Sequence, residues 1–264
     1  MTNFKKVIKN VWVAFGFFLI VVGVIGVIVG VVLLISGGDA VLEESKTYSV
    51  SQNVRELDVE IGAADFTIVK GETLSVESNL RYLTVKEKNG CLQIEEKRNR
   101  SKDYEGATLI LYLPEDFVFE EAEIATGAGV LKIDAFSAKK LTMELGAGEV
   151  EISKLTATEH AEIEGGAGKL TIKDGSLSNL DFEMGLGELN LTAAILGNSE
   201  IDCGVGKMNL TLKGGRETYS VILSKGIGNA TVDGQNVKNG ETVGGGANKL
   251  QINGGIGEIS VEFQ

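Results

Sequence analysis

Apolar and polar residues alternate along most of the chain after position 54, and a Gly-x-Gly triplet interrupts the alternation at regular intervals. An apolar residue stands three positions before the first glycine of each triplet, and others stand four and six positions after it. Alternation with a period of two predicts short β-strands with one buried face. The triplets start 19, 20, 19, 19, 22 and 29 residues apart, at Gly127, Gly146, Gly166, Gly185, Gly204, Gly226 and Gly255.

The triplets predict a corner in the chain. Counted from the first glycine, apolar positions are odd before the triplet and even after it, so one residue must be absorbed at the Gly-x-Gly. Glycine permits backbone angles that are closed to other residues. We therefore expect a structural corner formed by the outer glycines of all seven units, which are Gly127, Gly129, Gly146, Gly148, Gly166, Gly168, Gly185, Gly187, Gly204, Gly206, Gly226, Gly228, Gly255 and Gly257.

Two strands and a corner in about 19 residues cannot bury their apolar face alone, but stacked units can. Two arrangements compete: a parallel solenoid, and an antiparallel meander in which Gly-x-Gly is a hairpin loop. The position after the triplet reads Glu149, Lys169, Glu188 and Lys207 in successive units. In a parallel solenoid these would be opposite charges about 4.8 Å apart, whereas a meander would separate them by a strand. The sequence favours an all-β, stacked, β-helix-like solenoid over residues 54–264.

The solenoid is expected to start with irregular rungs over residues 54–120, before regular repeats over 121–264. Gly62-Ala63-Ala64 stands where a degenerate first unit would have its triplet. Asn89-Gly90 is a strong signal for a tight hairpin turn. Thr108–Leu113 predicts a further strand, ended by the single proline of the chain.

An uncharged run of 25 residues, Val11–Ile35, predicts a transmembrane α-helix over 11–36. At 1.5 Å per residue it would span about 37 Å, more than a bilayer core of about 30 Å. The alternative is a cleaved secretory signal, whose apolar stretch is shorter and is followed by a small-residue cleavage site. The run favours a permanent anchor. Residues 37–53 lack strand periodicity and are expected to be a linker.

Charges flanking this segment predict its orientation. Residues 1–10 carry three lysines and are expected to be a cytoplasmic tail, with the C-terminal domain extracytoplasmic, as in a single-pass protein of the cell membrane. Gly26 and Gly30 form a small-xxx-small pair, typical of helix-mediated dimers, although glycines are common in membrane helices generally.

Composition excludes several classes of function. The formal net charge is −12, and removing the three N-terminal lysines leaves −12 − 3 = −15 for the remainder. Nucleic acid requires a basic footprint, so it is not expected as a partner. One histidine and 2 cysteines far apart make a zinc or haem site improbable, so we expect no metal, no cofactor and no catalytic residue.

Acidic residues recur two and four positions before the triplets and should point outward from one sheet. They form a candidate acidic docking face made of Glu123, Glu144, Glu162, Glu164, Asp181, Glu183, Glu200 and Asp202. Like charges on adjacent rungs repel, so a one-sided arrangement is mildly costly. The functional interpretation is docking of cations, basic peptides or a basic envelope protein; the simpler one is that acids keep the solenoid soluble.

One segment carries a family resemblance: Leu111-Tyr112-Leu113-Pro114, then Thr126-Gly127-Ala128-Gly129-Val130-Leu131-Lys132-Ile133, then recurring G-A-G-[EK] units. It resembles the DUF4097 β-strand-repeat proteins of bacteria, which are labelled adhesins, over about residues 54–263. The resemblance implies the fold and a surface-exposed module, and it brings no catalytic residues. The last interval departs from the regular spacing and predicts an insertion around Gly234–Gly246.

Together these features predict a membrane-anchored, extracytoplasmic β-repeat module for binding or scaffolding in the cell envelope. One alternative is an envelope-stress or signalling accessory that acts through a membrane partner. The other is a carbohydrate-active solenoid enzyme, since carboxylate rows occur in such enzymes. That alternative is disfavoured, because the acidic face offers no basic residue or metal to hold an anionic polysaccharide.

Overall fold

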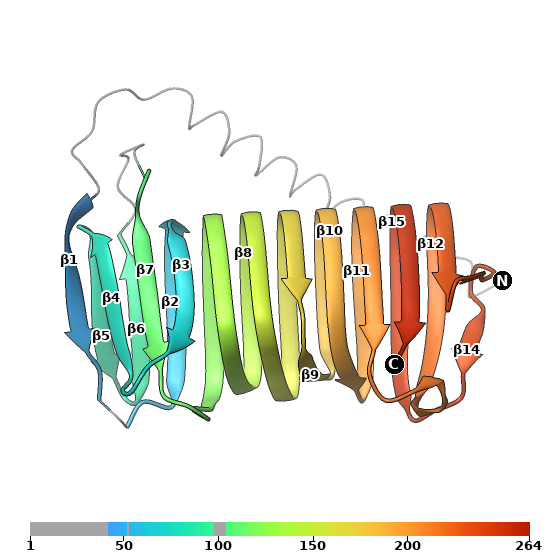
Figure 1. The fold of residues 1–264 in the computed structure, drawn as a ribbon, viewed down its shortest axis with the longest axis horizontal. Coiled ribbons are helices and arrows are strands. Elements are labelled where there is room, and N and C mark those ends of the chain that lie inside the picture. Colours follow the sequence, from blue (N-terminus) through green and yellow to red (C-terminus); the bar gives the residue numbers. More distant parts are fainter. Residues whose placement is uncertain (1–41, 52, 98–103) are drawn as a thin grey trace. The chain divides into compact units, whose positions relative to one another are not determined.

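The repeats form a succession of stacked rungs that runs from left to right in Figure 1, where one rung is one turn of the chain. The structure is a computed structural model, and it describes residues 42–51, 53–97 and 104–264. In chain order the elements are β1 Leu42–Ser49, β2 Glu56–Ala63, β3 Asp65–Lys70, β4 Ser75–Leu80, β5 Leu83–Lys88, β6 Cys91–Glu96, β7 Thr108–Leu113, β8 Phe119–Ile172, β9 Gly175–Ser178, β10 Leu180–Leu196, β11 Asn198–Leu212, the 3₁₀-helix η1 Arg216–Thr218, β12 Tyr219–Val232, β13 Gln235–Asn236, β14 Thr242–Gly244 and β15 Asn248–Phe263.

Adjacent rungs pair in parallel and in the register that the triplets predict. Between β10 and β11, Gly187 lies opposite Gly206 and Leu189 lies opposite Met208. The same columns continue from β10 back into β8. The parallel solenoid is therefore confirmed, and the antiparallel meander is wrong for these repeats.

Each triplet turns the chain without interrupting the strand, so that β8 runs through three corners. The second glycine of every triplet has φ between +130° and +150°. That region is closed to most L-residues, which explains why the corner repeats glycine. A side chain at Gly206 would also collide with the backbone carbonyl of Gly187 on the neighbouring rung.

The interior is a continuous column of apolar side chains. Ile163, Phe182 and Ile201 stack at one inward position, and all are buried. A rung has a third short side, which corrects the expectation of two strands per unit: Leu155–Ala157 pairs with β9, and β9 pairs with Ala194–Leu196. This additional side closes the core between one unit and the next, where Leu155, Leu177 and Ile195 are buried.

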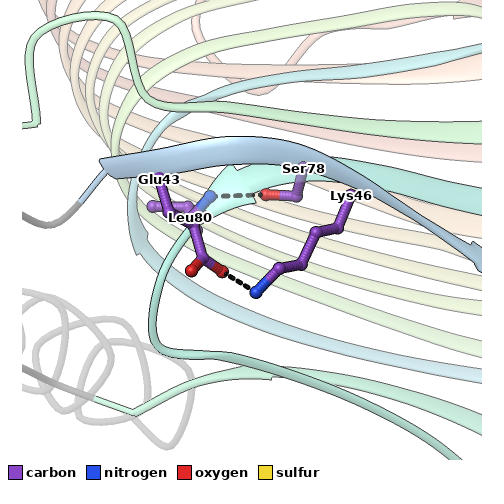
Figure 2. A network of polar contacts seen from close by, with 4 residues as sticks. All are labelled: Glu43, Lys46, Ser78 and Leu80. Carbon is purple, nitrogen blue, oxygen red and sulfur yellow. Dashed lines mark hydrogen bonds and ion pairs between the residues drawn. The ribbon is translucent and has the colours of Figure 1, made fainter.

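The predicted linker over 37–53 is wrong for part of its length, because β1 is a strand that pairs antiparallel with β4. The pairing contains an irregularity between Leu42 and Lys46. There Glu43 and Lys46 form an ion pair of 2.5 Å, while Ser78 in β4 accepts the Leu80 N–H (Figure 2). Backbone pairing supplied by a distant strand outweighs the weak local preference of this polar segment.

The rungs are not stacked in chain order at either end, which corrects the simple solenoid expectation. At the C-terminal end the spatial order is β11, β15, β12, so the last strand of the chain lies between two earlier ones (Figure 1). At the other end β2 lies between β6 and β8, and β3 lies between β7 and β8. At the C-terminal end the chain forms the outer strand β12 before the inner strand β15, whereas at the other end it forms the inner strands β2 and β3 before the outer strands β6 and β7.

The predicted insertion around Gly234–Gly246 contains β13 and β14, which pair antiparallel with β12 and cover its outer edge.

Tyr219, at the start of β12, anchors this end of the core. Its hydroxyl donates to the Lys213 carbonyl at 2.6 Å and accepts the Ile195 N–H at 3.1 Å. The insertion therefore ends the stack.

The predicted cytoplasmic tail over 1–10 and transmembrane helix over 11–36 lie outside the described residues. Within residues 42–51, 53–97 and 104–264, no helix is long and apolar enough to cross a bilayer.

Candidate acidic docking face

Six of the eight predicted acidic residues lie side by side on three adjacent rungs. Parallel pairing places them in two columns, since their strands keep one register. One column is Glu162, Asp181 and Glu200, and the other is Glu164, Glu183 and Asp202. Rungs are about 4.8 Å apart and the two columns about 7 Å apart, because alternate residues of a strand point to the same side.

Ion pairs with lysine or arginine do not neutralise these six carboxylates among the described residues. Partial burial raises the pKa of Glu164, and the charges of Glu144, Glu162 and Asp181 raise it further. Burial, followed by the charges of Asp202 and Glu164, likewise raises the pKa of Glu183. Glu144 thus belongs to the same electrostatic group, and the surface holds mutually repelling charges.

Two amide side chains, which the sequence analysis missed, end the cluster on β15. Gln251 donates to Glu200 at 2.7 Å, and Asn253 donates to Glu200 at 2.8 Å and to Asp202 at 2.6 Å. Burial raises the pKa of Asp202, while the Asn253 hydrogen bond opposes that rise. Stacking in chain order would have placed Ile222 and Ser224 of β12 at these positions, so only the exchanged rungs reveal the amides.

Glu123 lies apart from the six. It pairs in register with Asp58 of β2. Burial is the main cause that raises the pKa of the Cys91 thiol, and the charges of Asp58 and Glu123 raise it further. The alternating acids of β2 and the neighbouring Glu121, which were not predicted, extend this second acidic group. Their signal was the period-two pattern Glu56-x-Asp58-x-Glu60.

The column after the triplets alternates in sign, as the sequence predicts. Glu188 lies in register with Lys169 on one side and Lys207 on the other, and Lys207 lies 4.0 Å from Glu258. Acids on this side of the corner therefore have basic neighbours, whereas the acids of the docking face do not.

The carboxylates form flat rows rather than a point of convergence. In the described part of the chain, no group of three or more His, Cys, Asp or Glu residues is placed to hold a metal ion. Parallel outward rows at strand spacing instead match a partner that presents several positive charges along an extended surface.

The family model for Toastrack DUF4097 matches residues 66–262. The chain belongs to the Toastrack DUF4097 family. Membership accounts for most of the solenoid, and it confirms the resemblance carried by the proline-ended strand and the repeated corners.

Several solved structures are similar to this Toastrack chain over most of its length. A "putative cell adhesion protein" from Clostridium sporogenes is 13% identical, with 84% of this chain and 99% of that chain covered and a TM-score of 0.41. A "putative adhesin" from Bacteroides fragilis is 12% identical, with coverage of 82% and 95% and a TM-score of 0.40. Another from Parabacteroides merdae is 12% identical, with coverage of 85% and 97% and a TM-score of 0.40. No curated protein matches the chain.

Neutralising Glu183 should stabilise this Toastrack chain at pH 7. The pKa of Glu183 is raised in the folded state, so the fold binds more protons than the unfolded chain between the two pKa values, and stability falls as pH rises through that interval. We expect Glu183→Gln to raise the free energy of unfolding by about 0.5 kcal/mol, a small amount because solvent screens the charges. Urea unfolding at pH 7 and pH 4 would measure it.

The gain should shrink at pH 4, where the wild-type carboxylates gain protons. Glu188→Gln is the matched control, because it removes a carboxylate that has lysines on both adjacent rungs. Equal stabilisation by both substitutions at pH 7 would contradict a local effect of the acidic columns.

Proposed function

We propose that this protein is a membrane-anchored, extracytoplasmic binding or scaffolding module of the bacterial cell envelope, and that it docks cationic partners on its acidic face. The observation that carries the proposal is the pair of carboxylate columns without neutralising lysines. Burial raises the pKa values of Glu164, Glu183, Glu200 and Asp202, and repulsion from neighbouring carboxylates raises them further. A cationic partner relieves that repulsion and so gains affinity from it.

The solenoid suits this role because it holds the charges on a rigid support. Each carboxylate stands on a strand that is paired on both sides, and its spacing is fixed by backbone hydrogen bonds. A rigid array loses little conformational entropy when it binds. The membrane anchor and the orientation of the module rest on the uncharged run Val11–Ile35 and the lysines before it.

A cationic peptide tests the proposal. Binding of a fluorescent decalysine to the full chain in zwitterionic nanodiscs should be salt-sensitive, because exposed charges are screened. The triple variant Glu164→Gln, Glu183→Gln, Asp202→Asn should weaken it by about tenfold or more, since the peptide then loses the central charges of both columns.

The matched control is Glu149→Gln, Glu188→Gln, Glu258→Gln. It changes the net charge by the same amount but on the side of the corner where the column alternates in sign. We expect its affinity to stay within about twofold of wild type. An equal loss in both variants would reduce the face to bulk charge, and no binding to the wild type would remove the proposal.

A further inference from the structure

The corner of the solenoid carries an exposed apolar row that neither the fold nor the acidic face explains. The middle residue of each triplet points outward there. On the first three regular rungs it is alanine, but on the last four it is Leu186, Val205, Ile256 and Ile227 in spatial order. We call these four residues the corner ridge. Leu186 and Ile256 are 52% and 51% exposed, and Ile227 is 72% exposed.

The corner ridge stands clear of other side chains because glycines flank each of its members. Its residues are in register, so the four side chains form one row about 14 Å long. The segment after β12 forms hydrogen bonds on either side of this corner: the Lys225 N–H donates to the Asn239 side chain, and the Val237 N–H donates to the Ala230 carbonyl. Between them, among the described residues, no hydrogen bond covers the outer edge of the corner that holds Ile227.

Charges beside the ridge are of mixed sign, unlike those of the acidic face. The column after the ridge reads Glu188, Lys207, Glu258 and Asn229 in spatial order. A bilayer with anionic headgroups would meet an acidic domain here, with a formal charge of −15 once the N-terminal lysines are set aside. A second copy of the chain instead meets a column of mixed charges that includes Lys207, and its own carboxylates can pair with that lysine.

The column is complementary to itself when it is reversed. If two ridges lie antiparallel about a two-fold axis between β11 and β15, Lys207 of each copy faces Glu258 of the other. The same operation sets Val205 against Ile256 and Leu186 against Ile227. A two-fold contact needs this kind of self-complementary surface.

We infer that the corner ridge is the contact surface of a homodimer, formed by antiparallel apposition of two ridges with reciprocal Lys207–Glu258 pairs. Four side chains bury much less than the roughly 800 Å² per partner of a standard interface, so the contact is weak and transient in dilute solution. It becomes populated where chains are concentrated, for example on one membrane, which is the one step that rests on the proposed function.

Cross-linking of the full chain in membranes tests the geometry. In a Cys91→Ser, Cys203→Ala background, Val205→Cys brings two equivalent positions to about one rung spacing across the axis, and a short bis-maleimide should link them. Ala128→Cys lies on the same corner, but its equivalents would be about 40 Å apart, so it should not link. Linking at both positions, or at neither, overturns the antiparallel dimer.

Charge exchange between copies tests the pairing. With Val205→Cys present, Lys207→Glu alone and Glu258→Lys alone should each reduce cross-linking at least about fivefold, since like charges then face each other. Co-expressing the two variants under different tags should restore linking between tags, because each variant supplies the charge the other needs. Neither chain regains its own Lys207–Glu258 pair, so restoration reports contact between copies.

Further outcomes are decisive. Ile227→Asp should lower cross-linking, whereas Val118→Asp, at a residue 50% exposed outside the ridge, should not. Failure of the mixed charge variants to exceed either one alone overturns the pairing. A Val205→Cys thiol that neither links nor reacts with a water-soluble maleimide overturns the dimer in favour of a lipid-covered ridge.

Discussion

Replacing Gly206 with alanine should strongly destabilise the solenoid. Gly206 has φ +150°, and an added Cβ would collide with the Gly187 carbonyl oxygen and lie 2.8 Å from its carbonyl carbon. The atoms in the way belong to the backbone of β10, which cannot move aside without breaking its hydrogen bonds to β8 and β11. We expect a loss of at least about 3 kcal/mol in the free energy of unfolding, measured by urea denaturation of the full chain.

Gly245→Ala is the control for that experiment. No atom lies within 4 Å of a Cβ built there, and its backbone is outside the positive-φ region. Its stability should stay within about 0.5 kcal/mol of wild type. Similar losses at both positions would show that the corner geometry is not what requires glycine.

Deleting residues 248–264 should unfold the C-terminal end of the solenoid rather than only shorten it. This segment is β15, which pairs with β11 on one side and β12 on the other. Its buried residues Leu250, Ile252, Ile259 and Val261 contribute about 2 kcal/mol each, a sum comparable to the stability of a whole domain. Hydrogen exchange should show loss of protection in both β11 and β12.

The comparison for the deletion is replacement of residues 42–49 by a Gly-Ser segment of equal length. That change removes β1, which within the described part of the chain pairs with β4 alone and contains no fully buried residue. Protection should be lost in β1 and at the edge of β4 alone. Retained protection of β12 in the 248–264 deletion would contradict the exchanged order of rungs.

The regular rungs were predictable because their determinants are local and repeated. A positive-φ corner needs glycine, and an inward position needs an apolar side chain, so both recur at fixed offsets in the sequence. The core of the acidic face followed from the same register, because residues at one offset become neighbours when rungs stack in parallel. Glu123 stands at the same offset from its triplet as Glu162, but the unit between them has Thr142 at that offset. The acidic column is therefore interrupted, and Glu123 does not belong to it.

What was missed depends on contacts between segments distant in sequence. β1 lacks an apolar period and becomes a strand because β4 offers it a free edge. The exchange of β12 and β15 leaves no trace in the triplet spacing beyond a longer last interval. For the same reason, the sequence did not reveal that Gln251 and Asn253 lie at the end of the acidic face. The ridge was overlooked because the middle residues vary from alanine to isoleucine, and only stacking makes them one surface.

The exchanged order at the C-terminal end constrains when the protein can finish folding. Synthesis delivers β12 before β15, so the outer rung exists while the place beside β11 is still empty. The regular rungs from β8 to β11 can be completed one after another as the chain emerges, but the final pair has to wait for the last residues. For that interval β11 presents an open parallel edge, which is the kind of surface that chaperones shield and that aggregates recruit. The C-terminal segment thus acts as the closing step of assembly.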